Sequence, residues 1–155
     1  IHGGIAGAHA VMPTHTTAGV AVACLKGGLS QSNFYSAQLH DMVAYHPFEG
    51  ITVHAEEGPR VLASIGQRKA VILRNHGLLT VGASIPAAFL NMYTFENTCQ
   101  IQVTAQACGE LIEVNPDIMR DMPQVMRIAT AGQGPAIAWP ALLRKLDRLD
   151  PSYKT

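Results

Sequence analysis

Short apolar runs separated by turn residues recur along the first half of the chain and predict strands joined by tight turns. The pattern predicts strands at residues 10–12, 42–45, 50–54, 70–74 and 78–81. The run at 70–74 is the clearest, because its apolar, β-branched residues lead directly into the corner Asn75-His76-Gly77. The return from 70–74 to 78–81 is too short for a crossover, so these two strands must pair antiparallel.

Helical spacing of apolar residues, bounded by caps and glycines, predicts helices between these strands. They are expected at residues 18–25, 32–40, 60–65, 84–108 and 141–149, with a short one starting at 115–116. Thr16 or Thr17 can cap the first helix, and Trp139-Pro140 leads into the last one. Strands and helices alternate, which predicts the α/β class with a sheet that is at least partly antiparallel.

The longest predicted helix has clear boundaries. Ser84 is a capping residue, Pro86 suits a first turn, and Gly109 follows Cys108 as a stop signal. The larger apolar side chains fall mostly on one broad face, which we expect to be buried: Phe89, Met92, Tyr93, Ile101 and Val103.

Composition limits the class of protein. The chain has 155 residues, 48% of them hydrophobic and 14% charged, with a formal net charge of zero. These values allow one compact domain with a real core and argue against disorder. A neutral chain lacks the basic face of a nucleic-acid-binding protein, and no apolar run is long enough to span a membrane.

Charged residues are unevenly distributed. Lys26 is the only charged residue in positions 1–40, and Arg74 and Glu96 are the only two in positions 70–109. Two interpretations remain open: these stretches supply the core, or part of their surface is covered by another subunit, since interface centres are poor in charge.

The three cysteines do not form a recognisable motif. Cys24, Cys99 and Cys108 have no CxxC spacing, and Cys24 and Cys99 lie within apolar helical patterns. We therefore expect buried free thiols in a reducing compartment, and no secretory signal is evident, which favours the cytoplasm. No base is positioned to activate Cys24 as a nucleophile.

Two of the seven histidines stand out by context. His15 follows a predicted strand and precedes a helix, and His76 lies in the corner after the clearest strand. Loop positions held by rigid elements are common places for metal ligands, and imidazole is a frequent ligand of zinc. The alternative is that each is a structural histidine bonded to a backbone carbonyl. No acidic residue precedes Asp41, so an acid or base beside His15 must come from elsewhere.

The residues around His15 and His76 resemble the class II aldolase/adducin family, and the resemblance extends over nearly the whole chain. The most specific stretch is ILRNHGLL at 72–79, together with WPALLRKLDRLDPSY at 139–153. Further similar stretches are AVMPTHTTAGVAV (10–22), VAYHPFEG (43–50), EGPRVL (57–62) and AFLNMYTFENTCQIQ (88–102).

This resemblance implies a fold, an assembly and a chemistry. The fold is a three-layer α/β/α domain around a mainly antiparallel sheet, in a cyclic homotetramer with active sites between subunits. Catalytic members hold a divalent cation, usually zinc, with a His-x-His pair and a third histidine from a His-Gly corner. The cation polarises a carbonyl/hydroxyl pair of a small-molecule substrate and stabilises an enediolate during aldol cleavage. A glutamate upstream is the acid/base, and an aromatic hydroxyl of a neighbouring subunit protonates the leaving aldehyde.

Carried onto this chain, the resemblance makes His15 and His76 metal ligands. Pro13 stands where the first histidine of the pair is expected, and proline has no ligating side-chain atom, so we expect a weakened zinc site. Tyr45, or less readily Tyr35, is the candidate aromatic acid, with a merely packed tyrosine as the alternative.

The amino-terminal segment 1–9 departs from the family pattern, and the acid/base glutamate would lie before it. We therefore expect residues 1–155 to form a single domain of this family that lacks its amino-terminal part, with a complete carboxyl-terminal end. Three interpretations remain: a metal-dependent aldolase or a related epimerase or decarboxylase, an adducin-like binding or scaffold domain without catalysis, and an incomplete chain whose apparent defects are not biological.

Overall fold

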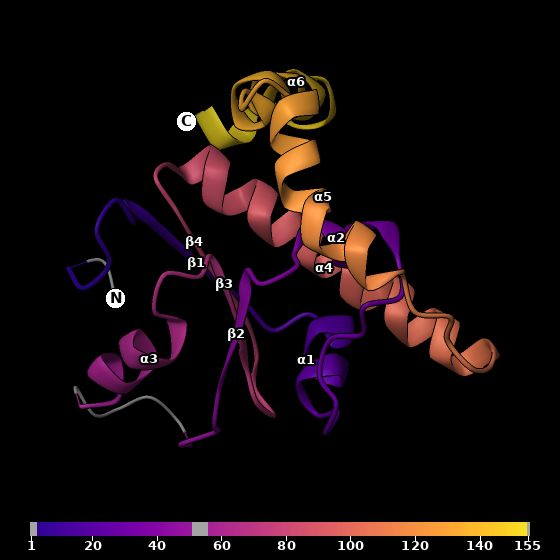
Figure 1. The fold of residues 1–155 in the computed structure, drawn as a ribbon. Helices are drawn as coiled ribbons and strands as arrows, with labels where there is room; N and C mark the ends of the chain where they lie inside the picture. Colours follow the sequence, from indigo (N-terminus) through magenta and orange to yellow (C-terminus); the bar gives the residue numbers. More distant parts are fainter. Residues whose placement is uncertain (1–2, 51–55, 155) are drawn as a thin grey trace.

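A four-stranded sheet forms the centre of the molecule, with helices on both faces (Figure 1). This computed structural model describes residues 3–50 and 56–154. The strand predicted at 50–54 therefore lies almost entirely outside the described residues. Helix α3 (Glu57–Ile65) covers one face of the sheet, and α1 (Thr17–Ala23) and α4 (Ile85–Cys108) cover the other. The predicted three-layer α/β/α arrangement is confirmed.

The sheet has the strand order β1-β4-β3-β2 and mixed directions. Strand β4 (Gly77–Gly82) pairs antiparallel with β1 (Ala10–Thr14) and with β3 (Ala70–Leu73), whereas β2 (Val43–His46) pairs parallel with β3. Strands β1, β2 and β3 therefore all finish at the same end of the sheet, where β4 begins. We call this the carboxyl end of the sheet, and it is where α/β proteins usually bind ligands.

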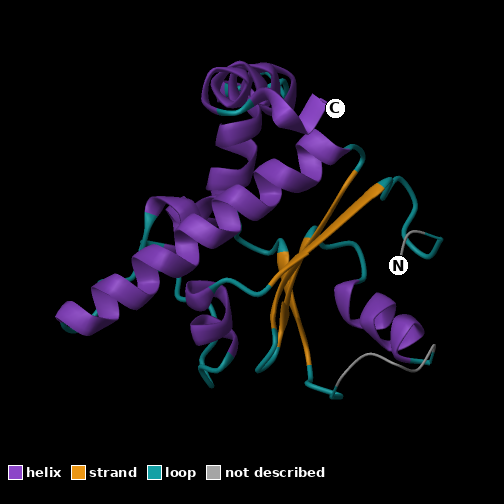
Figure 2. Ribbon diagram, turned by 180° about the vertical axis from the view of Figure 1, so that it is seen from behind, coloured by secondary structure: helices purple, strands orange, loops and turns teal. Residues whose placement is uncertain are grey.

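The remaining helices pack outside α4 or extend from it. Helix α2 (Phe34–Gln38) and α5 (Pro116–Ala129) lie against each other on the α4 side, and α6 (Gly134–Leu149) crosses near the start of α4 (Figure 2). A short 3₁₀ turn, η1 (Pro151–Lys154), follows α6. Of the helices in the described part of the chain, none is long and apolar enough to cross a membrane.

Alternation along the strands creates two cores. Ala70 and Ile72 of β3 face α1 and α4, whereas Val71 of the same strand faces α3, as the period of two in a strand requires. The buried residues of the core on the α1–α4 side all come from the two charge-poor stretches: Val22, Ala23, Leu29, Leu39, Ala70, Ile72, Leu78, Met92, Phe95 and Cys99. The charge-poor stretches therefore supply the core on this side.

The boundaries of α4 were predicted correctly, but of the five residues assigned to its apolar face only Met92 is buried. Ser84 caps the helix by accepting from the Ala87 amide, and Gly109 follows its end. Tyr93 is 54% exposed, and Ile101 and Val103 also face outward. The buried stripe instead combines small, polar and large residues at helical spacing: Ala88, Met92, Phe95, Thr98, Cys99 and Gln102. Residue size was a poor guide, because the positions of α4 that face the sheet and α1 are buried whatever the size of their side chains.

The two carboxyl-terminal helices are longer than predicted. Helix α5 has 14 residues, and α6 starts at Gly134, so the prediction that Trp139-Pro140 precedes the last helix is wrong. Pro123 and Pro140 lie inside these helices, although each removes one intrahelical hydrogen bond. Pro140 and Ala136, whose carbonyl loses its partner, are both exposed, so water can take the missing donor's place.

The cysteines differ in environment. Cys99 is buried, and burial raises the pKa of its thiol to about 12, which makes it inert at neutral pH. Cys24 is exposed at the end of α1, so the prediction that it is buried is wrong, and Cys108 is exposed as well. The apolar pattern of α1 ends one residue before Cys24, which is the helix C-cap.

We expect Gln102→Leu to lower the free energy of unfolding by about 2–4 kcal/mol, because two buried backbone groups would lose their partners. The Gln102 side chain, 1% exposed, accepts from the Ser30 amide at 2.8 Å and donates to the Gly28 carbonyl at 2.9 Å. Urea unfolding measures the change. The matched variant Gln106→Leu, at an exposed position of the same helix, should change stability by less than about 0.5 kcal/mol; equal losses in both variants would contradict the assignment.

Candidate functional site

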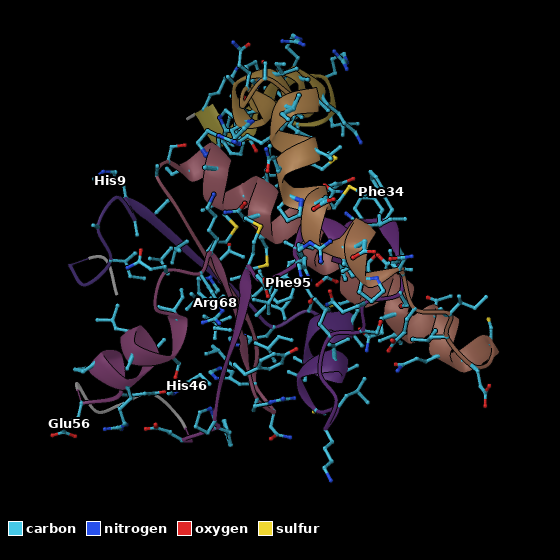
Figure 3. The ribbon with its side chains drawn as sticks, in the orientation of Figure 1. His9, Phe34, His46, Glu56, Arg68 and Phe95 are labelled. Carbon is cyan, nitrogen blue, oxygen red and sulfur yellow. The ribbon has the colours of Figure 1, made fainter. Side chains whose placement is uncertain are left out.

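The carboxyl end of the sheet gathers three histidines from distant segments. His15 directly follows β1, His46 is the last residue of β2, and His76 lies in the corner between β3 and β4. Strands β1, β2 and β3 run in the same direction, so their ends meet here. His9 lies at the opposite end of β1, as Figure 3 shows, and does not take part.

His15 and His76, the two sequence-predicted site residues, are brought together. Their imidazole rings stack with centroids 4.7 Å apart and planes inclined by 8°. His15 is exposed and His76 is half-buried. A glycine makes this approach possible, since a Cβ on Gly77 would lie 2.3 Å from the Thr14 carbonyl oxygen and 3.2 Å from Cδ2 of His15. The backbone of the corner therefore touches the backbone just before His15.

The residues on either side of His15 are tied to helix α4. Thr14 donates from its hydroxyl to the sulfur of Met92 at 3.3 Å. Thr16 accepts from the Gly19 amide as the N-cap of α1 and donates its hydroxyl proton to the half-buried carboxylate of Glu96. These bonds fix the chain direction at His15, although the imidazole itself remains free to turn about its own side-chain bonds.

A second histidine environment lies at the end of β2. His46 is 2% exposed and is hydrogen-bonded through Nδ1 to the Ser64 hydroxyl at 2.9 Å. Its Nε2 has no hydrogen-bond partner among the described residues and lies 3.5 Å from a Glu49 carboxylate oxygen. Glu49 is bonded to Arg60, and this ion pair holds the pKa of the Glu49 carboxyl below its usual value. Phe48, between His46 and Glu49, meets the His76 ring edge-on at 6.0 Å.

Tyr45 has a defined place, next to the site but not in contact with the imidazole pair in the described contacts. Its hydroxyl accepts from the Leu29 amide at 3.0 Å, and the Arg74 guanidinium lies over its ring at 4.3 Å from the centroid. Gly28 leaves room for the ring, since a Cβ there would lie 2.5 Å from it. Tyr35 lies on α2, where Phe34 meets its ring edge-on at 5.5 Å.

The donor set at this end of the sheet suits a divalent cation only in part. Two imidazoles lie side by side, but no group of three or more histidine, cysteine, aspartate or glutamate side chains in the described residues could hold a metal. A metal lies in the plane of each imidazole that binds it, so the nearly parallel rings of His15 and His76 must turn to share one ion. His15 is exposed and has room for that turn, whereas His76 is half-buried and in contact with Phe48.

Pro13 occupies the position expected for a further ligand. It lies in β1, opposite Leu79, and β1 is an edge strand, where the missing amide of proline is tolerated. Residues 13 and 15 project to the same side of an extended chain. A histidine at position 13 would therefore have its side chain on the same side as His15.

The sequence predicted the histidine pair but not the residues around it. No local motif pointed to the Thr16–Glu96 bond, to the Phe48–His76 contact or to the His46–Ser64 bond at the end of β2. A usable signal was present for Arg74 and Glu96, because they are the only charged residues of the stretch 70–109 and both lie at the carboxyl end of the sheet.

Comparison with known proteins supplies an independent line of information. The sequence model of the Class II Aldolase and Adducin N-terminal domain matches residues 1–103. A Pseudomonas aeruginosa protein whose name assigns it to the class 2 aldolases is 43% identical to this chain over 148 residues. The match covers 93% of this chain and 57% of that protein.

Two solved structures share the fold. An aldolase II superfamily protein from Pseudomonas syringae superposes with a TM-score of 0.92 at 35% identity, covering 100% of this chain and 62% of that one. An L-fuculose 1-phosphate aldolase from Glaciozyma antarctica superposes with a TM-score of 0.79 at 27% identity, covering 97% of this chain and 57% of that one. The chain thus spans about three-fifths of the length of these relatives.

We expect Gly77→Ala to lower the free energy of unfolding by about 1–3 kcal/mol and to separate the two imidazoles, because the added Cβ overlaps the Thr14 carbonyl. Urea unfolding and the ring-proton NMR shifts of His15 and His76 measure the two effects. Gly27→Ala is the control, since a Cβ there meets nothing within 4 Å and Gly27 is exposed. That variant should change the free energy of unfolding by less than about 0.5 kcal/mol. Unchanged ring shifts in Gly77→Ala would contradict the role given to Gly77.

Proposed function

The chain belongs to the class II aldolase and adducin family, and on that premise we propose that it carries part of an aldolase-type active site for a small hydroxy-carbonyl substrate. The observation that carries this proposal is the pairing of His15 with His76 at the carboxyl end of the sheet. These two residues, 61 positions apart in sequence, converge there through the β1–β4 pairing, and both side chains suit a divalent cation such as zinc.

Each residue of this site has a stated part in the proposal. A bound divalent cation would polarise a carbonyl and an adjacent hydroxyl of the substrate, which favours cleavage of the carbon–carbon bond beside them. His15 and His76 hold the cation, and the Thr16–Glu96 hydrogen bond keeps His15 at the end of β1. Phe48 covers one side of His76 and limits the directions from which water reaches it.

Tyr45 is proposed as a proton donor to a site of a neighbouring subunit. Its hydroxyl accepts from the Leu29 amide, which leaves the hydroxyl proton available for donation. Tyr45 is 37% exposed, so a neighbouring subunit can approach it. This role requires a homo-oligomer, for which we propose a tetramer.

Pro13 favours a second candidate function, an adducin-like binding or scaffold domain. Two imidazoles with no third ligand among the residues that the structure describes would hold a cation weakly, and the family includes adducins as well as aldolases. Metal binding distinguishes the two functions, because a scaffold domain has no need to retain ligands at His15 and His76.

We expect the chain to bind zinc measurably but weakly, and His15→Ala and His76→Ala each to lower its zinc affinity by about tenfold or more, since each removes one of two ligands. Isothermal titration calorimetry measures the affinity. His9→Ala is the matched control, because His9 is exposed at the far end of β1. Equal zinc affinities in all four proteins would refute the proposed site.

We expect Pro13→His to raise zinc affinity by about tenfold or more, because a third imidazole would lie on the same side of β1 as His15. The same variant should still not cleave L-fuculose 1-phosphate, since the nearby carboxylates are engaged, Glu96 by Thr16 and Glu49 by Arg60. Calorimetry and an aldehyde-release assay measure the two outcomes. Tight, stoichiometric zinc in the unaltered chain, or turnover in Pro13→His, would contradict this account.

A further inference from the structure

A cavity of about 560 Å³ opens beside the histidine pair. It is an open pocket at the surface, bordered by the end of α1, the segment after β2 and the corner after β3. Lys26, Phe48, Arg74 and Asn75 are among its lining residues. Two of these residues connect it to the pair: Asn75 directly precedes His76, and Phe48 contacts the His76 ring edge-on. One aromatic ring therefore separates the cavity from His76.

The charge of this cavity is positive. Lys26 and Arg74 come from the two charge-poor stretches, where they are the only basic residues, and both line it. The described residues that line the cavity include no aspartate or glutamate, and no ion pair among the described residues involves Lys26 or Arg74. Two cations kept together without a counter-charge favour an anion.

The Arg74 guanidinium is held in one orientation. It donates to the Leu25 carbonyl at 2.7 Å and lies over the Tyr45 ring, which the Leu29 amide anchors in turn. A guanidinium has five N–H donors, so the bond to Leu25 leaves further donors for a ligand. Arg74 also caps the end of α1, which by itself would explain its bond to Leu25. Capping does not explain why Lys26 faces the same cavity.

A divalent cation held by the histidine pair would add to the positive potential. His15 and His76 are neutral donors when they bind a cation, so the bound ion would keep its full charge. A substrate that reaches both the ion and the cavity would neutralise this charge best with an anionic group at one end.

We propose that this cavity binds the phosphate or carboxylate group of the substrate through Arg74 and Lys26, while the hydroxy-carbonyl end reaches the histidine pair. The link to the substrate rests on the proposed function, whereas the anion site stands on the cavity alone. The fixed Arg74 guanidinium can donate two parallel hydrogen bonds to two oxygens of one anion. Lys26 supplies a positive charge on a flexible side chain at the rim of the cavity.

Isothermal titration of the metal-free chain with inorganic phosphate, and separately with acetate, tests the anion site. Lys26→Gln should weaken phosphate binding by about threefold and Arg74→Lys by about tenfold, since the second variant keeps the charge but loses the fork. Lys145→Gln, at an exposed position of α6, is the matched control and should leave the affinity unchanged. Lys26 is exposed, so its substitution leaves the fold intact and keeps the test valid if Arg74→Lys is unstable.

His15→Ala separates this proposal from the proposed function. That variant should bind phosphate within about twofold of the unaltered chain, because His15 does not line the cavity. Phosphate binding without zinc binding would support the anion site and refute the metal site. Binding of phosphate but not acetate assigns a phosphate ester, and binding of both assigns either anionic group. No phosphate binding, or equal affinities in the unaltered chain, Lys26→Gln and Arg74→Lys, would overturn the proposal.

Discussion

The contact between the corner after β3 and the end of β1 is the constraint on which the rest of the structure depends. Gly77 lies against the Thr14 carbonyl with no room for a Cβ, and this contact brings His76 onto His15. The register that pairs Thr14 with Leu78 sets the same alignment along the whole of β1 and β4. A shift by one residue would turn the side chains of β1 to the opposite face and separate the two imidazoles.

Local signals predicted the elements, and long-range contacts decided the rest. The helix from Ser84 to Gly109 and the strand from Ala70 were identifiable because their caps and β-branched residues act within a few positions. The histidine pair was predicted from loop context and from the family resemblance. The Thr16–Glu96 hydrogen bond joins residues 80 positions apart, and no local sequence pattern predicts such a contact. The prediction of the buried face of α4 failed at most positions for the same reason, because the packing neighbours, and not residue size, determine which positions are buried.

Charge is scarce in this chain, and its placement follows from that scarcity. The segments that form the core on the α1–α4 side can carry few charges, because buried charges are costly without partners. The three charges they retain, Lys26, Arg74 and Glu96, all lie around the carboxyl end of the sheet. Glu96 fixes the backbone beside His15, whereas Lys26 and Arg74 line the neighbouring cavity. The few charged side chains of these segments therefore lie at the carboxyl end of the sheet, where a ligand can contact them.

The most direct test of this account is an anomalous-diffraction map of crystals soaked in zinc. The account predicts a zinc peak within bonding distance, about 2.1 Å, of one ring nitrogen each of His15 and His76, with both rings turned out of the stacked arrangement. The remaining positions around the ion would be filled by water, because Pro13 supplies no ligand. A map in which His15 and His76 stay stacked and zinc binds only at other residues would contradict the central claim.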